Sequence, residues 1–184
     1  IKWLALEQVV RLFLQFAQSV VLARVLTPLD FGLAASVAIV VGLATALADP
    51  GVSSVVVQWK QTTPRLEAAA SWVALSAGGL ATATVAAMAQ PVSDFFKADQ
   101  LSVALQLTAV YVFLVSWVPV PSGLLMRTQR FRAQALIAIV STVAALAAGI
   151  AVAIAGYGVF ALFIIPIVGA TVTVVTQFMA LGRG

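Results

Sequence analysis

Long apolar segments determine what this chain can fold into. Hydrophobic residues make up 62% of its 184 residues and charged residues only 9%, whereas soluble domains are about a quarter charged. A helix needs about 20 apolar residues to cross the ~30 Å core of a bilayer. A membrane barrel would need alternating strands, and runs such as residues 144–148 do not alternate. The sequence therefore predicts an all-α integral membrane protein with six spanning helices, at residues 3–26, 31–57, 66–90, 100–126, 133–155 and 158–181.

The breaks between these helices carry helix-start and turn signals. Thr27 is followed by Pro28 and Asp30, which is typical of a Thr cap with proline at the first helical position and an acid at the third. Thr63 precedes a proline in the same way. Residues 156–158 read Gly-Tyr-Gly, so we expect the fifth and sixth helices to pack as an antiparallel hairpin.

Prolines and small residues inside the apolar segments predict kinks and close packing. Pro119 and Pro121 should kink the fourth helix, and Pro166 the sixth. Glycine and alanine are dense at residues 78–79, 144–149 and 169–170. In lipid such residues let helix backbones approach closely.

Basic residues are unevenly shared between the two ends of the predicted bundle. Seven lie at one end and two at the other, and the positive-inside rule then places both termini in the cytoplasm. The net charge of +4 is a topology signal, so we expect no nucleic-acid partner. The larger group is Lys2, Lys60, Arg65, Arg127, Arg130, Arg132 and Arg183, and the smaller is Arg24 and Lys97.

A polar stripe crosses the first predicted helix. Gln8, Arg11, Gln15 and Gln18 share an arc of roughly 80°, with Glu7 at its edge. A charge in a spanning helix is costly unless it faces water or a partner. The stripe either lines a hydrated, cationic cavity for an anionic or sugar-rich substrate, or it binds helices together, with the acid neutralising the arginine.

Three other charged groups have both a functional and a structural interpretation. Asp49, Pro50 and Gly51 form either a coupling carboxylate or hinge, or a plain helix end and turn. Arg24 and Asp30 flank the first outer turn, and we expect a salt bridge between them. The cytoplasmic cluster marks topology and is also able to meet lipid phosphates at the inner leaflet. It consists of Arg127, Arg130 and Arg132.

Enzyme chemistry finds little support in the sequence. Cysteine and histidine are both absent, which removes thiolate and imidazole ligands and any histidine base. Asp94 and Asp99 in an outer loop are the nearest approach to a carboxylate pair. No P-loop or Gly-x-Ser-x-Gly motif is present. We expect no catalytic residue, metal site or cofactor.

Four sequence motifs resemble those of one protein family and occur in the same order along the chain. Residues 22–32 (LARVLTPLDFG) are similar to the LAR-L-[ST]-P-x-D-F-G hairpin of Wzx-type polysaccharide flippases of the multidrug/oligosaccharidyl-lipid/polysaccharide exporter superfamily. The next three motifs of the family also have counterparts here. They are residues 49–52 with 57–58 (DPGV, VQ), residues 125–131 (LMRTQRF) and residues 156–162 (GYGVFAL). Pro50 departs from the family, which usually has an apolar residue there.

The resemblance implies a function and a larger assembly. Such flippases move undecaprenyl-pyrophosphate-linked oligosaccharides from the inner to the outer leaflet of the bacterial cytoplasmic (inner) membrane, by rocking two six-helix lobes around a hydrophilic cavity. This chain looks like the amino-terminal lobe of a longer protein, so a second lobe is expected. Membrane lipids and the polysaccharide polymerase machinery are the other expected partners. The coupling ion and the glycan (O-antigen, capsule or exopolysaccharide) stay open.

Two alternatives also stay open. The first is a cation-coupled multidrug exporter of the same superfamily, although such exporters more often carry an isolated acid in the cavity. The second is a membrane scaffold for glycan assembly that transports nothing.

Overall fold

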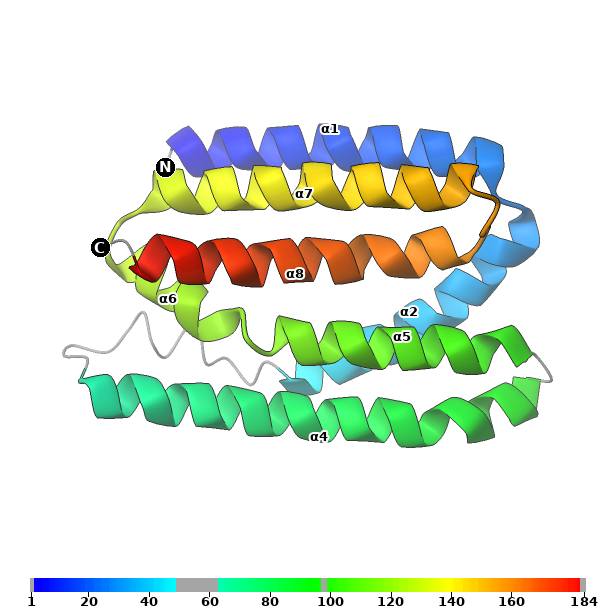
Figure 1. The fold of residues 1–184 in the computed structure, drawn as a ribbon, viewed down its shortest axis with the longest axis horizontal. Helices are drawn as coiled ribbons and strands as arrows, with labels where there is room; N and C mark the ends of the chain where they lie inside the picture. The colour runs from blue at the N-terminus through cyan, green and yellow to red at the C-terminus, as the bar shows by residue number, and fades with distance from the viewer. Residues whose placement is uncertain (1, 49–62, 97–98, 183–184) are drawn as a thin grey trace.

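The computed structural model describes residues 2–48, 63–96 and 99–182, and almost all of them are helical (Figure 1). These ranges contain no strand, and the all-α membrane fold predicted from the apolar segments is confirmed. The helices are α1 (Lys2–Val25), α2 (Pro28–Ala48), α4 (Pro64–Phe96), α5 (Asp99–Val115), α6 (Pro119–Arg127), α7 (Phe131–Ile154) and α8 (Phe160–Gly182).

The long helices lie side by side in an order that differs from their order in the chain (Figure 1). α7 packs between α1 and α8, α8 packs on α5, and α5 packs on α4. α2 packs against α4 and α5. The N- and C-termini lie at the same end of the bundle, which we call the terminal end, and the α1–α2 turn lies at the opposite end (Figure 1).

Five helical stretches in the described ranges are long and apolar enough to cross a membrane. α1 is as long as α7, at 24 residues, but it is not among the five because its polar stripe lowers its hydropathy. The chain is a multi-pass membrane protein. The five stretches are Pro28–Ala46, Ala68–Phe95, Leu101–Arg127, Phe131–Ile154 and Phe160–Leu181.

Two helices differ from the boundaries predicted by the sequence. α4 continues to Phe96 through Pro91, beyond the predicted end at residue 90, although this proline lacks the N–H that would bond within the helix. The predicted helix 100–126 is interrupted after Val115 and resumes at Pro119 as α6. Since Pro119 and Pro121 both lack an N–H donor, the span is broken there rather than only kinked.

The predicted caps and the short turn are present. The Thr27 N–H and its hydroxyl both donate to Oδ2 of Asp30, each at 2.8 Å, and the Asp30 N–H returns to Thr27 Oγ1 at 3.4 Å. This is a reciprocal capping box. At the end of α7, Gly156 and Gly158 adopt φ values of 85° and 47°, where side chains are strained, and the chain reverses into α8.

Close packing through glycine is confirmed at two helix contacts. A Cβ built on Gly78 of α4 would lie 2.1 Å from Cβ of Ser116. A Cβ on Gly149 of α7 would lie 2.2 Å from Cγ1 of Ile165 in α8. Without side chains at these glycines, α4 meets the end of α5 and α7 meets α8 at a distance that alanine would not permit.

Candidate functional site

The polar stripe of α1 lies partly against the concave side of the bundle, toward α5, α7 and α8. Gln8 and Gln15 are exposed, and Arg11 and Gln18 are half-buried. Exposure here means that this chain does not cover the side chain. Arg11 donates from Nη2 to Oε1 of Gln8, so one glutamine of the stripe orients the guanidinium. The backbone of Glu7 belongs to α1, but its side chain lies outside the described residues.

Three residues of this stripe line one hollow of about 360 Å³. Arg11, Gln15 and Gln18 form its α1 wall. The remaining walls come from α5, α7 and α8, with Pro166 and Gly169 among the apolar lining residues. The other polar side chains of the lining are Tyr111, Ser141, Thr142 and Thr173.

The hydroxyl groups of this polar hollow keep acceptor capacity. Thr142 donates to the carbonyl of Ala138 at 2.7 Å, and Thr173 donates to that of Gly169 at 2.8 Å. Each hydroxyl thereby places its hydrogen on its own helix, while its oxygen lone pairs remain able to accept. A ligand in the hollow would meet a cation and amides from α1 and acceptor oxygens from α7 and α8.

A second hollow, of about 380 Å³, lies beside the polar one and shares Tyr111 and Pro166 with it. Its walls come from α2, α5 and α8. Thr108, its remaining polar side chain, donates to the carbonyl of Ala104 at 2.8 Å. The concave surface therefore changes from polar near α1 to apolar near α2, with Tyr111 at the border.

The predicted ion pair between Arg24 and Asp30 is not formed. Both residues are described, and the Asp30 carboxylate is instead used by Thr27 in the capping box. Arg24 is exposed. The prediction was wrong: the carboxylate is held by a cap that forms within a single turn of its own helix. Asp49, Pro50 and Gly51 lie outside the described residues, so their proposed role stays a prediction.

The basic cluster surrounds the α6–α7 turn at the terminal end. Arg127 is half-buried at the end of α6, and Arg130 and Arg132 are exposed. Arg130 donates from Nη1 to the carbonyl of Ala180 in α8 at 3.2 Å. Gln129 between them has a positive φ of 53°. The cluster therefore also ties the turn to α8.

Several contributing residues were missed from the sequence. Tyr111, Thr142 and Thr173 are isolated polar residues in apolar helices, and only the packing of α5, α7 and α8 brings them opposite α1. Gln177 is 2% exposed and donates from Nε2 to Ser122 Oγ at 2.8 Å, linking α8 to α6. A buried glutamine in an apolar helix was a readable signal for such a link.

Comparison with known proteins assigns the chain to a family. The sequence model of the family described as "Polysaccharide biosynthesis protein" matches residues 21–182. The chain belongs to this family. The match begins within α1, so the polar stripe lies before it. The description of the family associates its members with polysaccharide biosynthesis.

One relative is an "Uncharacterized membrane protein in cps region" of Klebsiella pneumoniae. It is 32% identical over 114 residues, which are 62% of this chain and 23% of the relative. The chain thus aligns with less than a quarter of the length of that protein. No solved structure matches the chain.

Proposed function

We propose that this chain is one lobe of a flippase that moves lipid-linked oligosaccharides across the bacterial inner membrane for surface polysaccharide synthesis. The carrier lipid would be undecaprenyl pyrophosphate. A second six-helix lobe would close the cavity, and polysaccharide polymerase machinery would use the product. No cofactor or catalytic residue is assigned. This proposal rests on the family, on the resemblance of the four motifs, and on the polar hollow.

The polar hollow is the observation that carries the proposal. A glycan head that crossed hydrocarbon unaided would lose its water at several kcal/mol per unsatisfied polar group. Arg11 is suited to a pyrophosphate because a guanidinium donates two hydrogen bonds at once. Gln15 and Gln18 both donate and accept, as sugar hydroxyls require. Rocking of two lobes would expose such a hollow to each side in turn.

The proposal is tested by replacing Arg11 with alanine in the full-length protein. Losing a hydrogen-bonded charge costs roughly 1.5–3 kcal/mol, so we expect surface polysaccharide export to fall by about 10- to 100-fold. Arg24→Ala, on the same helix but outside the hollow, is the matched control and should leave export unchanged. Protein abundance in the membrane is measured for both variants.

The outcome separates the three candidate functions. Loss of export with Arg11→Ala supports the flippase. A change in drug resistance with export intact would support the multidrug exporter, and no effect on either would support the scaffold. Export equal to wild type at equal abundance would overturn the assignment of Arg11 to the cargo.

Cysteine accessibility tests the hollow directly. Single cysteines at positions 8, 11, 15 and 18 should react with a membrane-impermeant thiol reagent, since the side chains they replace border an aqueous space. Cysteines at positions 9, 13 and 20, on the apolar faces of α1, should stay protected. Equal protection of both sets would favour the interpretation of the stripe as a dry helix contact.

A further inference from the structure

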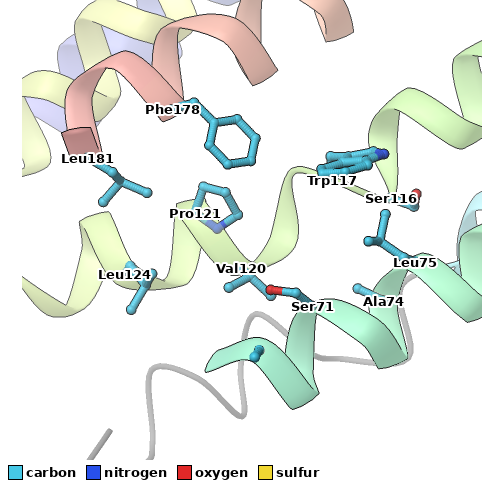
Figure 2. A pocket seen from close by; sticks show the side chains of 11 residues that line it. Ser71, Ala74, Leu75, Ser116, Trp117, Val120, Pro121, Leu124, Phe178 and Leu181 are labelled. Carbon is cyan, nitrogen blue, oxygen red and sulfur yellow. The ribbon is translucent and has the colours of Figure 1, made fainter. Parts of the chain in front are cut away.

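A third hollow, of about 360 Å³, opens between α4, α6 and α8 where the fourth span is broken (Figure 2). Phe178 and Leu181 of α8 lie on one side of it, Pro121 and Leu124 of α6 line its middle, and α4 forms the other side (Figure 2). Trp117 lies at one end, with its ring edge-on to Phe178 at a centroid distance of 6.2 Å. Its lining is mostly apolar.

This apolar hollow is separate from the polar one. Val115 at the end of α5 and Val118 in the turn after it line the polar hollow, whereas Ser116 and Trp117 of the same turn line the apolar hollow. The two hollows share no lining residue. A ligand in the polar hollow therefore does not reach the apolar one.

Two arginines lie at the terminal end of the apolar hollow. Arg127 follows Leu124 by three residues on α6, so the two side chains share a face of that helix. Arg130 is held by the carbonyl of Ala180, the neighbour of Leu181. The end of the hollow is therefore cationic.

The length of the hollow matches one leaflet. Along α4 its lining extends from Ala68 to Leu75, which is roughly 10 Å at ~1.5 Å per residue. Half of the bilayer core measures about 15 Å. The hollow is thus an apolar slot that lies within one leaflet and has positive charge at its membrane-surface end.

We propose that this slot holds one hydrocarbon chain of an anionic phospholipid from the leaflet at the terminal end, with the phosphate group bound by Arg127 and Arg130. An alkyl chain suits the lining, and the negative headgroup suits the charge at the rim. The lipid is a resident of the surrounding leaflet and not the transported cargo, because the slot and the polar hollow share no lining residue. This site is independent of the proposed transport function.

Quenching of Trp117 fluorescence by brominated lipid chains tests the site. In full-length protein whose other tryptophans are replaced by phenylalanine, including Trp72→Phe, Trp117 reports occupancy of the slot. The protein is reconstituted in vesicles of phosphatidylcholine with brominated phosphatidylglycerol or brominated phosphatidylcholine as the probe. Two arginines near the surface should make half-maximal quenching occur at a roughly 10- to 30-fold lower mole fraction of the anionic probe.

Charge removal and salt give the controls. Arg127→Gln with Arg130→Gln should abolish the preference, whereas Arg24→Gln at the opposite end of the bundle should retain it. Because Arg130 also holds Ala180 in place, a second measurement uses no arginine substitution: raising the salt concentration should reduce the preference by screening. Equal quenching by both probes would overturn the proposal in favour of ordinary boundary lipid. Absence of quenching by either probe would overturn it in favour of a protein segment covering the slot.

Discussion

At the level of single residues, two charged side chains are satisfied by neighbours one turn away. Arg11 uses Gln8 one turn away, and Asp30 uses Thr27 across the first turn of α2. Both spacings are readable in the sequence, so the stripe and the cap could be predicted. Arg24 was also predicted as a partner of Asp30, because sequence distance alone does not show whether a cap or an ion pair is more stable.

Asp30→Ala tests which of these two interactions stabilises the first turn. Loss of the capping box should cost about 0.5–2 kcal/mol, seen as a lower unfolding midpoint in detergent. Arg24→Ala should have almost no effect, since Arg24 forms no ion pair with Asp30. Equal destabilisation by both substitutions would indicate that Arg24 and Asp30 do form a salt bridge.

Thr173→Val asks whether the hydroxyls of the polar hollow contact cargo. Valine keeps the shape and removes an acceptor, so we expect transport to fall several-fold, as for a lost hydrogen bond of about 1 kcal/mol, with little change in unfolding midpoint. Thr171→Val, on an exposed position of the same helix outside the hollow, serves as the control. Export is measured at matched expression, and identical export by the two variants would remove Thr173 from the site.

At the level of helices, the sequence predicted well that these segments are apolar helices, and predicted less well the residues at which they begin and end. The apolar runs and Thr caps located the starts of α2 and α4 within a few residues. Proline was harder to interpret: Pro91 and Pro166 lie inside continuous helices, whereas Pro119 and Pro121 coincide with a break. The break also coincides with a close helix contact, since Ser116 lies against Gly78 of α4.

Neighbouring glycines in α4 offer a matched test of that contact. Gly78→Ala would place a methyl group against Ser116 and should destabilise the protein by about 1–3 kcal/mol. Gly79→Ala meets nothing within 4 Å and should be neutral or stabilising by up to ~1 kcal/mol. Thermal unfolding in detergent measures both.

Ser116→Gly should partly rescue the Gly78→Ala variant, because it removes the atoms that the new methyl group would strike. If Gly78→Ala and Gly79→Ala behave alike, the close approach of α4 and α5 at this point is wrong.

At the level of the whole molecule, helix neighbours could not be read from the chain. Only the α7–α8 hairpin was predicted, from the two-glycine turn, whereas α1 packs against α7, which lies more than a hundred residues later. The polar hollow depends on this distant pairing. Its α1 wall was therefore predictable, while Tyr111, Thr142 and Thr173 opposite it were not.

Orientation is a further whole-molecule prediction. The excess of Lys and Arg at the terminal end predicts that this end faces the cytoplasm. A cysteine at exposed position 132 should be protected from an impermeant reagent in intact spheroplasts and react in inverted vesicles, and a cysteine at position 24 should behave in the opposite way. The reverse pattern would place the termini outside.

The attachment of α1 to α7 also has a consequence for biogenesis. An arginine at the centre of a helix opposes insertion from the translocon by roughly 2.5–3.5 kcal/mol, and the three glutamines of α1 add to this cost. α1, which is synthesised before the other helices described here, is therefore among the least able to remain in the bilayer alone. Its main neighbour, α7, begins more than a hundred residues later in the chain. We expect α1 to become fixed in place only after α7 has been synthesised.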